Sequence, residues 1–294
     1  MTGDRPPDRW LVLRILAPAD PEVRSLMVEC LLEEARGVEE QDDALVIHLP
    51  PPEGQSAEDF ARALRHSLVE RTGIDTLEIE TGWQPHEAWE DCWRQHFRPR
   101  RITERIVVSP SWETPEVEPG QCLVTLDPGM AFGTSDHPTT RGCLRMLDRW
   151  VEPGIRMADI GSGSGILAIT AALLGAGEVL AIELDPWACS AARENVVLNG
   201  VEDRVEVRAA PVTSDGLPGE APFDGIVANI ESGILLPLLP ALHAALEPGG
   251  WLVLSGILRN EAEGVLAAAT DAGLHFEEAD EEGEWWTGAF TAPL

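Results

Sequence analysis

Asp159-Ile160-Gly161-Ser162-Gly163-Ser164-Gly165 is the most informative stretch of this 294-residue chain. It lies between a predicted strand at 156–160 and an apolar run of helical length. Glycines at such a junction allow a tight turn, and they let a ligand approach the main chain beside the helix N-terminus. A dinucleotide-binding loop needs a third small residue at position 166, where this chain has Ile166. The Gly-x-Gly-x-Gly spacing therefore argues against a pyrophosphate-binding loop.

The residues from about 150 onward alternate between strand-like and helix-like segments, which is typical of an open α/β sheet. Strands are predicted at 156–160, 178–184, 204–209, 223–230 and 250–257. Helices are predicted between and after them, near 165–174, 186–198, 233–246 and 260–272. The segments 274–278 and 285–291 are expected to close the sheet as a terminal hairpin.

Residues 1–82 are predicted to form a separate, smaller α+β domain. Their apolar patterns indicate strands at 10–16, 37–40, 44–49 and 77–80, and helices at 21–35 and 56–71. Ser56 is the expected N-cap of the second helix, because its hydroxyl can accept a hydrogen bond from a free main-chain amide. The order βαββαβ is that of a ferredoxin-like domain, and this fold alone names no function.

Residues 83–112 are expected to connect this domain to a larger one that spans 113–294. Trp89, Trp93 and Phe97 share one face of a predicted helix and are interpreted as core packing. The connector also holds the one basic cluster of the chain, whose members are Arg94, Arg98, Arg100, Arg101 and Arg105. We expect these arginines to form ion pairs with the acidic surface, and an anion-binding role is the alternative.

The chain is strongly acidic, because 51 Asp and Glu residues face only 21 basic residues, all of them Arg, for a net charge of −30. This charge disfavours non-specific binding to nucleic acid or anionic membranes. A salt-adapted or GC-rich source is the preferred explanation of the acidity, and attraction of a basic partner is the alternative. The five cysteines are scattered, which argues against a disulfide framework or a cysteine-based zinc site. No apolar run has the length of a membrane span or a signal peptide. We expect a cytoplasmic, monomeric protein without a metal site.

The glycine spacing resembles the S-adenosylmethionine loop of class I methyltransferases. Glu183 ends the second predicted strand, 22 residues after Gly161, where a carboxylate can accept hydrogen bonds from both ribose hydroxyls. Asp185-Pro186 looks instead like a helix N-cap followed by a proline at the first helical position. Glu183 is therefore preferred over Asp185 as the ribose ligand.

The end of the fourth predicted strand bears on the methyl acceptor. Methyltransferases of planar nitrogens often carry two prolines and an aromatic residue there, and the aromatic ring supports the flat acceptor. This chain has Asn229-Ile230-Glu231-Ser232, without proline or aromatic residue. An sp³ amine, oxygen or carbon is therefore the expected acceptor.

Four segments are similar to the PrmA family, the bacterial methyltransferases of the large-subunit ribosomal protein L11. They are Leu126–Thr140, Asp159–Gly165, Val227–Ile230 and Leu254–Leu258. The resemblance extends over nearly the whole chain. It implies a class I methyltransferase with a Rossmann-like, seven-stranded sheet and a small N-terminal ferredoxin-like domain. It also implies S-adenosylmethionine as the cofactor and L11 as the protein substrate, with no direct nucleic-acid partner.

The same resemblance implies roles for particular residues. Thr140, Gly161, Glu183 and Asn229 are expected to bind the cofactor, together with Gly163 of the glycine loop. In this family the N-terminal domain recognises L11, whose lysine side chains and α-amine become trimethylated.

Two positions depart from the family pattern. Ser135 replaces the second glycine of the usual Gly-Thr-Gly, which is expected to stiffen that loop. Glu183 stands where Asp is more usual and is one methylene longer. His137, in the same loop as Ser135, is given no catalytic role, and no general base is identified.

Three alternatives remain open on these grounds. The target of methylation could be lysines of another protein, such as an electron-transfer flavoprotein subunit, because related enzymes share parts of the pattern. A nicotinamide-dependent oxidoreductase is disfavoured by the glycine spacing. A non-catalytic binding module with this fold is disfavoured by the presence of Gly161, Glu183 and Asn229.

Overall fold

The computed structural model describes residues 8–16, 21–32, 35, 38–40, 43–52, 54–74, 77–85, 97–127, 133–214, 216–217 and 222–294. The chain forms two compact units, Met1–His96 and Phe97–Leu294. The predicted connector helix with Trp89 and Trp93 lies outside the described residues, as does Arg94 of the basic cluster. No helix in the described ranges is long and apolar enough to cross a membrane.

The smaller unit has the element order βαββαβ. Its elements are β1 (Arg9–Leu16), α1 (Pro21–Leu32), β2 (Glu39–Glu40), β3 (Ala44–Leu49), α2 (Ala57–Thr72) and β4 (Ile79–Pro85). The strands form an antiparallel sheet in the order β2-β3-β1-β4. Leu11, Leu13 and Ile15 alternate along β1 and are fully buried in the core of this unit. The period of two places these side chains on one face of the sheet, in the same cluster as side chains from both helices.

Helix α2 is capped at both ends. The Ser56 hydroxyl accepts a hydrogen bond from the Asp59 amide at 3.1 Å, which confirms the predicted N-cap. Gly73 ends the helix with a φ of +73° and donates its amide to the Val69 carbonyl oxygen.

The larger unit is built on a seven-stranded sheet in the order β10-β9-β8-β11-β12-β14-β13. Its strands are β8 (Arg156–Ile160), β9 (Glu178–Glu183), β10 (Val205–Ala209), β11 (Phe223–Asn229), β12 (Leu246–Leu258), β13 (His275–Glu282) and β14 (Trp285–Thr291). The first five are parallel, and β14 and β13 form the predicted antiparallel hairpin. The predicted strands are all present.

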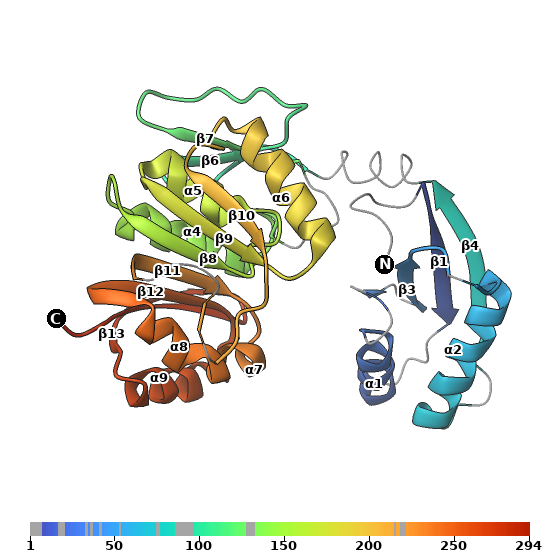
Figure 1. Ribbon diagram of the computed structural model, residues 1–294. Helices are drawn as coiled ribbons and strands as arrows, with labels where there is room; N and C mark the ends of the chain where they lie inside the picture. Colours follow the sequence, from blue (N-terminus) through green and yellow to red (C-terminus); the bar gives the residue numbers. More distant parts are fainter. Residues whose placement is uncertain are drawn as a thin grey trace. The chain divides into compact units, whose positions relative to one another are not determined.

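Helices cover both faces of this sheet (Figure 1). One face carries α4 (Pro138–Trp150), α5 (Ile166–Leu174) and α6 (Pro186–Leu198). The other carries α7 (Ser232–Leu235), the short 3-10 helix η1 (Leu236–Leu238), α8 (Leu239–Ala244) and α9 (Ala262–Asp271). In β11, Val227 joins one core while Ile226 and Ala228 join the other, so the strand is buried on both faces. Where one helix was predicted at 233–246, the structure has three short helical segments. Prolines stand at the start of the second and third.

The second half of the predicted connector belongs to the larger unit. Strands β5 (Arg100–Arg101), β6 (Ile106–Ser109) and β7 (Cys122–Thr125) form a small sheet of their own. Ile106, Val108 and Val124 pack in the same core as α4 and α5. Burial of these apolar strands explains why the unit begins at Phe97 and not at residue 113.

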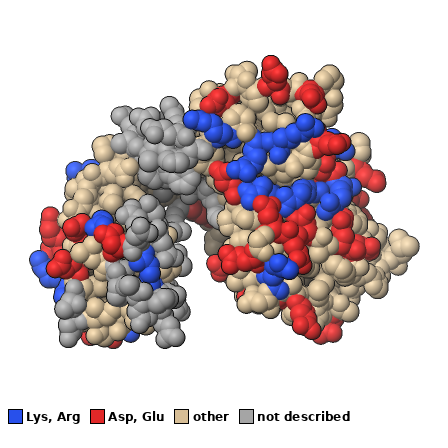
Figure 2. All heavy atoms as spheres, turned by 180° about the vertical axis from the view of Figure 1, so that it is seen from behind, with Lys and Arg blue, Asp and Glu red and all other residues tan. Residues whose placement is uncertain are grey.

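Three arginines of the basic cluster form ion pairs. They are Arg98 with Glu113, Arg100 with Asp136, and Arg105 with Asp148, at 3.3, 2.8 and 3.1 Å. A second set links α4 to β13: Arg141 with Glu282, Arg145 with Asp280 and Glu282, and Arg149 with Glu278. Figure 2 shows arginine side chains gathered in a band on one face of the larger unit, with acidic side chains beside them. The ion-pair interpretation of the cluster is confirmed for these members.

Candidate functional site

The glycine loop lies at the carboxyl end of β8, directly before α5. Gly161, Gly163 and Gly165 have φ angles of +70°, +52° and +82°, which only glycine adopts at little cost. The amides of Gly161 and Ser162 both donate to the carbonyl oxygen of Ile182 on β9, at 2.9 and 3.1 Å. These two hydrogen bonds hold the loop against the neighbouring strand β9 without help from a ligand.

Gly161 has a second reason to be glycine. A Cβ atom at this position would lie 2.6 Å from Cγ2 of Ile230, the residue that follows β11. Two carbon atoms cannot approach this closely, so any side chain at position 161 would force the Ile230 side chain to move. The first glycine thus brings the ends of β8 and β11 close together, at the edge of the sheet where open α/β proteins bind their ligands.

Glu183 ends β9 and reaches the glycine loop. Its Oε2 accepts a hydrogen bond from the Gly163 amide at 2.9 Å. Its Oε1 accepts from the amides of Leu184 and Asp185, at 2.8 and 2.9 Å. A carboxylate offers about four acceptor positions, so three main-chain amides leave about one of them free, on Oε2. The extra methylene relative to Asp lets this side chain turn back on its own strand end.

Asp185 caps α6, as its sequence context predicts. Its Oδ1 accepts a hydrogen bond from the Trp187 amide at 3.0 Å, and Pro186 occupies the first helical turn. The two acidic residues at the end of β9 therefore differ in their contacts. Glu183 contacts the glycine loop, whereas the structure records Asp185 at the helix N-terminus.

Four buried side-chain oxygens near this edge of the sheet have no hydrogen-bond partner among the described residues. They are Thr140 Oγ1, Asp159 Oδ1, Ser162 Oγ and Asn229 Oδ1. A buried polar atom without a partner costs on the order of 1–3 kcal/mol, so such atoms are uncommon without an explanation. A ligand that carries hydroxyl and ammonium groups would supply the missing donors.

Asn229 and Thr140 come to this edge from different elements. Asn229 is the last residue of β11 and stands in register with Ser255 of β12. The Ser255 hydroxyl donates to the Thr139 carbonyl oxygen at 3.3 Å, which ties the first turn of α4 to the same strand. Of the five predicted site residues, Gly163 bonds to Glu183, and Gly161 bonds to Ile182, the neighbour of Glu183 on β9. Asn229 lies at the end of β11, the strand that pairs with β8 on its other side.

Asp159 is fully buried in β8, one residue before the loop. Burial raises its pKa to about 7, the Ala168 amide that donates to Oδ2 at 3.1 Å opposes the rise, and the charge of Glu183 adds to it. Asp159 and Ser162 were not among the predicted site residues. An acidic residue inside an apolar strand was the available signal for Asp159.

His137 caps α4. Its Nδ1 is 2.7 Å from Thr139 Oγ1, and its ring lies edge-on to Trp285 with centroids 5.0 Å apart. Burial, with the charge of Arg141, lowers the pKa of His137 and so favours the neutral ring. His137 therefore has a structural role at the N-terminus of α4.

A second set of contacts holds the segment before α4 against the glycine loop. The Ser164 hydroxyl donates to the Gly133 carbonyl oxygen at 2.6 Å, and the Asn195 amide donates to the Ser164 carbonyl oxygen at 3.0 Å. Asn195 Oδ1 also accepts from the Asp127 amide at 3.3 Å. Residues 128–132 between these anchors lie outside the described part of the chain. Because the partners are 31 or more residues apart, no local pattern identified them.

Comparison with known proteins finds a family model and relatives that match most of this chain. Residues 20–292 match the family model described as "Ribosomal protein L11 methyltransferase (PrmA)". A protein of that name from Chloroflexus aurantiacus is 40% identical over 257 residues, which cover 80% of this chain and 78% of the relative. Another, from Pelotomaculum thermopropionicum, is 42% identical over 207 residues, 70% of this chain and 66% of the relative. The matched part thus spans about two thirds to four fifths of these relatives' lengths.

The fold has a solved counterpart. A crystal structure described as a ribosomal protein L11 methylase, from Lactobacillus delbrueckii subsp. bulgaricus, superposes with a TM-score of 0.62 at 32% identity. The match covers 67% of this chain and the whole of that one. The seven-stranded sheet of the larger unit is therefore the class I methyltransferase fold expected from the sequence.

Proposed function

Since this chain belongs to the ribosomal protein L11 methyltransferase (PrmA) family, we propose that it methylates amines of ribosomal protein L11 with S-adenosylmethionine as the donor. One observation supports this most directly. The glycine loop and Glu183 are joined by a hydrogen bond at the edge of the sheet where Asn229 Oδ1 and Ser162 Oγ are buried with no partner in the described part of the chain. These relatives carry the L11 name, so they give no support to the electron-transfer flavoprotein alternative.

The site residues fit the proposed cofactor. Glu183 Oε2 retains one acceptor position for a ribose hydroxyl, because the Gly163 amide is its one donor among the described residues. Thr140 Oγ1 and Ser162 Oγ can pair with the amino-acid end of the cofactor, whose ammonium donates and whose carboxylate accepts. S-adenosylmethionine, when bound, supplies a methyl group on a positively charged sulfur, which an amine can displace in line.

The protein's contribution is mainly to align the acceptor amine and favour its neutral form. A lysine with pKa ~10.4 costs roughly 4–5 kcal/mol to deprotonate at pH 7, whereas an α-amine near ~7.8 costs about 1 kcal/mol. A desolvated site lowers the cost for lysine, because burial disfavours the charged ammonium. We assign Asn229 Oδ1 as the acceptor of a hydrogen bond from the substrate amine, since this buried oxygen has no described partner. Water takes the proton in this scheme.

The smaller unit recognises the protein substrate in this proposal. The glycine loop, Glu183, Thr140 and Asn229 all belong to the larger unit. The net charge of −30 attracts a basic protein at long range, and added salt weakens that attraction. We propose that the enzyme acts as a monomer.

The test is a direct assay with purified components. The full-length protein is incubated with isotope-labelled S-adenosylmethionine and L11 from the same organism, and the modified positions are mapped by mass spectrometry. Labelled L11 is the expected result, together with loss of the same methyl groups from L11 in a strain without the gene. An electron-transfer flavoprotein subunit serves as the comparison substrate. Label on that subunit and none on L11 contradicts the proposal.

A further inference from the structure

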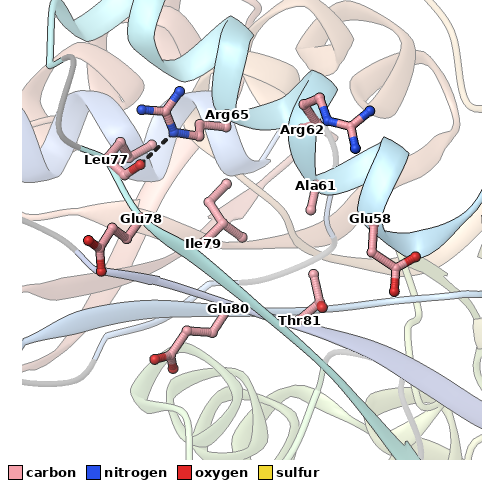
Figure 3. A pocket seen from close by; sticks show the side chains of 9 residues that line it. All are labelled: Glu58, Ala61, Arg62, Arg65, Leu77, Glu78, Ile79, Glu80 and Thr81. Atoms are coloured by element: carbon pink, nitrogen blue, oxygen red, sulfur yellow. Dashed lines mark hydrogen bonds between the residues drawn. The ribbon is translucent and has the colours of Figure 1, made fainter.

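The smaller unit contains a groove between α2 and the beginning of β4 (Figure 3). Its volume is about 700 Å³. It is lined by Glu58, Ala61, Arg62, Arg65, Leu77, Glu78, Ile79, Glu80 and Thr81. We call it the α2–β4 groove. All of its lining residues belong to the unit without the methyl-transfer residues.

One wall of the groove is the open edge of a sheet. Strand β4 pairs only with β1 among the described strands, so its other edge has no partner there. The Leu16 amide donates to the Glu78 carbonyl oxygen, so the main-chain groups of Glu78 point toward β1. Because these groups alternate along a strand, those of Ile79 and Thr81 point to the open edge. The main-chain groups of two alternate residues, Ile79 and Thr81, are therefore available to pair with another strand.

The open edge has a definite beginning. Arg65 Nε donates to the Leu77 carbonyl oxygen at 2.6 Å, which satisfies the first outward-facing carbonyl from the side of α2. From Ile79 onward no described residue provides such a bond. The side chain of Ile79 is half buried in the core, whereas Thr81 is exposed. Main chain added beside Ile79 and Thr81 would continue the sheet from a well-packed strand.

The groove offers carboxylates beside an apolar floor. Ala61 and Leu77 are buried and form the floor together with Ile79. Glu58 and Glu78 are exposed and form no ion pair with any residue that the structure describes. The arginines that line the groove already have partners: Arg62 with Asp59 at 2.8 Å, and Arg65 with the Leu77 carbonyl oxygen.

We propose that the α2–β4 groove docks an extended, lysine-bearing segment of the protein substrate, which joins the sheet as a strand beside β4. The segment's main chain pairs with Ile79 and Thr81, as in other cases of strand addition. Its basic side chains meet Glu58 on the helix side and Glu78 on the opposite face. This inference rests on the proposed function, because it takes the substrate to be the basic protein L11.

Charge selects this occupant over a second copy of the chain. An open edge strand also invites pairing with another copy of itself. Two copies would each bring a net charge of −30, and the carboxylates beside this edge would face one another. A lysine-bearing strand pairs with the same main-chain groups and neutralises those carboxylates.

The main experiment compares two substitutions at one position of the full-length protein. Thr81→Pro removes the outward-facing amide hydrogen and places a ring against any added strand, and it leaves the pairing with β1 in place. Thr81→Val keeps the amide hydrogen and the branched shape, so it is the matched control. The dissociation constant for purified L11 is expected to rise about tenfold or more in Thr81→Pro, since a main-chain hydrogen bond is lost and a clash is gained. It is expected to stay near the original value in Thr81→Val.

A second pair of variants tests the charges. Glu58→Gln with Glu78→Gln is expected to weaken L11 binding several-fold at low salt, with little difference at 1 M salt. Glu116→Gln with Glu118→Gln removes two exposed charges from the larger unit and is the control. S-adenosylmethionine affinity, and methylation of a short peptide that carries the L11 N-terminal amine, should be unchanged in every variant. These readouts separate docking from chemistry.

The outcomes distinguish this proposal from the proposed function. If the unmodified enzyme methylates L11 and Thr81→Pro binds L11 as tightly as Thr81→Val does, only the groove assignment is overturned. If the unmodified enzyme neither binds nor methylates L11, both proposals are overturned. A dimer in analytical ultracentrifugation that Thr81→Pro dissociates assigns the edge to a second copy and rejects the docking proposal. If Thr81→Pro fails to fold by circular dichroism, the glutamate variants decide.

Discussion

The main-chain amide of Gly163 donates a 2.9 Å hydrogen bond to Oε2 of Glu183, so one carboxylate joins the glycine loop to the end of β9. The other oxygen of Glu183 accepts two amides of its own strand end. Glu183 therefore holds the loop in place and also retains an acceptor position for a ligand. Its two roles make it the first residue to test.

Glu183→Ala is expected to weaken S-adenosylmethionine binding by ~1.5–3 kcal/mol, the range for hydrogen bonds to a charged group. Titration calorimetry measures the change directly. Asp185→Asn is the matched control, because Asn also caps helices and the variant loses one nearby negative charge. Unchanged affinity in Glu183→Ala would place the ribose elsewhere, and a loss in Asp185→Asn would point to Asp185.

Gly161→Val is expected to abolish cofactor binding and also to destabilise the fold. The φ of +70° is unfavourable for a β-branched residue, and the new Cβ would lie 2.6 Å from Ile230 Cγ2. Backbone strain of this kind costs on the order of 1–3 kcal/mol, measurable by urea unfolding. Adding Ile230→Ala should relieve the contact and leave the backbone strain. Full recovery of stability in the double variant would show that the contact alone was responsible.

Asp159→Asn is expected to change how stability depends on pH. Burial raises the pKa of Asp159 to about 7, whereas the unfolded chain releases this proton near ~3.9. Between about pH 4 and pH 7 the native state holds more protons, so its free energy of unfolding falls as pH rises through that window. Asn does not titrate, so the variant lacks this fall and gains stability relative to the original protein toward pH 7.

Urea unfolding at pH 5, 6, 7 and 8 measures that difference. It should grow by up to ~1.4 kcal/mol per pH unit and level off above about pH 7. Asp203→Asn, whose side chain is 78% exposed, is the control and should show no such trend. A constant difference between Asp159→Asn and the original protein across this range is incompatible with a raised pKa.

Removal of the smaller unit, residues 1–96, is expected to separate binding from recognition. Affinity for S-adenosylmethionine should stay within about threefold, or under ~0.7 kcal/mol, because every assigned cofactor residue lies in the larger unit. Methylation of intact L11 should fall by orders of magnitude, because substrate positioning is lost. Circular dichroism must first show that the shortened protein is folded. If it then methylates L11 as well as the full-length enzyme does, the smaller unit is not the recognition element.

Local patterns were sufficient for the individual strands of the large sheet and for telling apart the two acidic residues at the end of β9. Strand β8 was predicted at its observed bounds, and α6 at Pro186–Leu198, because apolar periodicity and caps act within a few residues. The glycine spacing predicted a tight turn, and the structure adds that all three glycines have positive φ angles. Asp185 and Glu183 were given different roles because a helix cap has its own local pattern.

Contacts between distant segments required the folded chain. Nothing near Ser164 in sequence shows that its hydroxyl bonds to Gly133 or that Asn195 supports it from α6. The small sheet with Ile106 and Val124 was taken for connector, because short strands at 100–125 gain their stability from the core of the larger unit. The back-folded carboxylate of Glu183 and the open edge of β4 likewise depend on which strands become neighbours. Periodicity constrains each segment, whereas pairing and burial depend on residues far away in sequence, and those are set only when the chain packs.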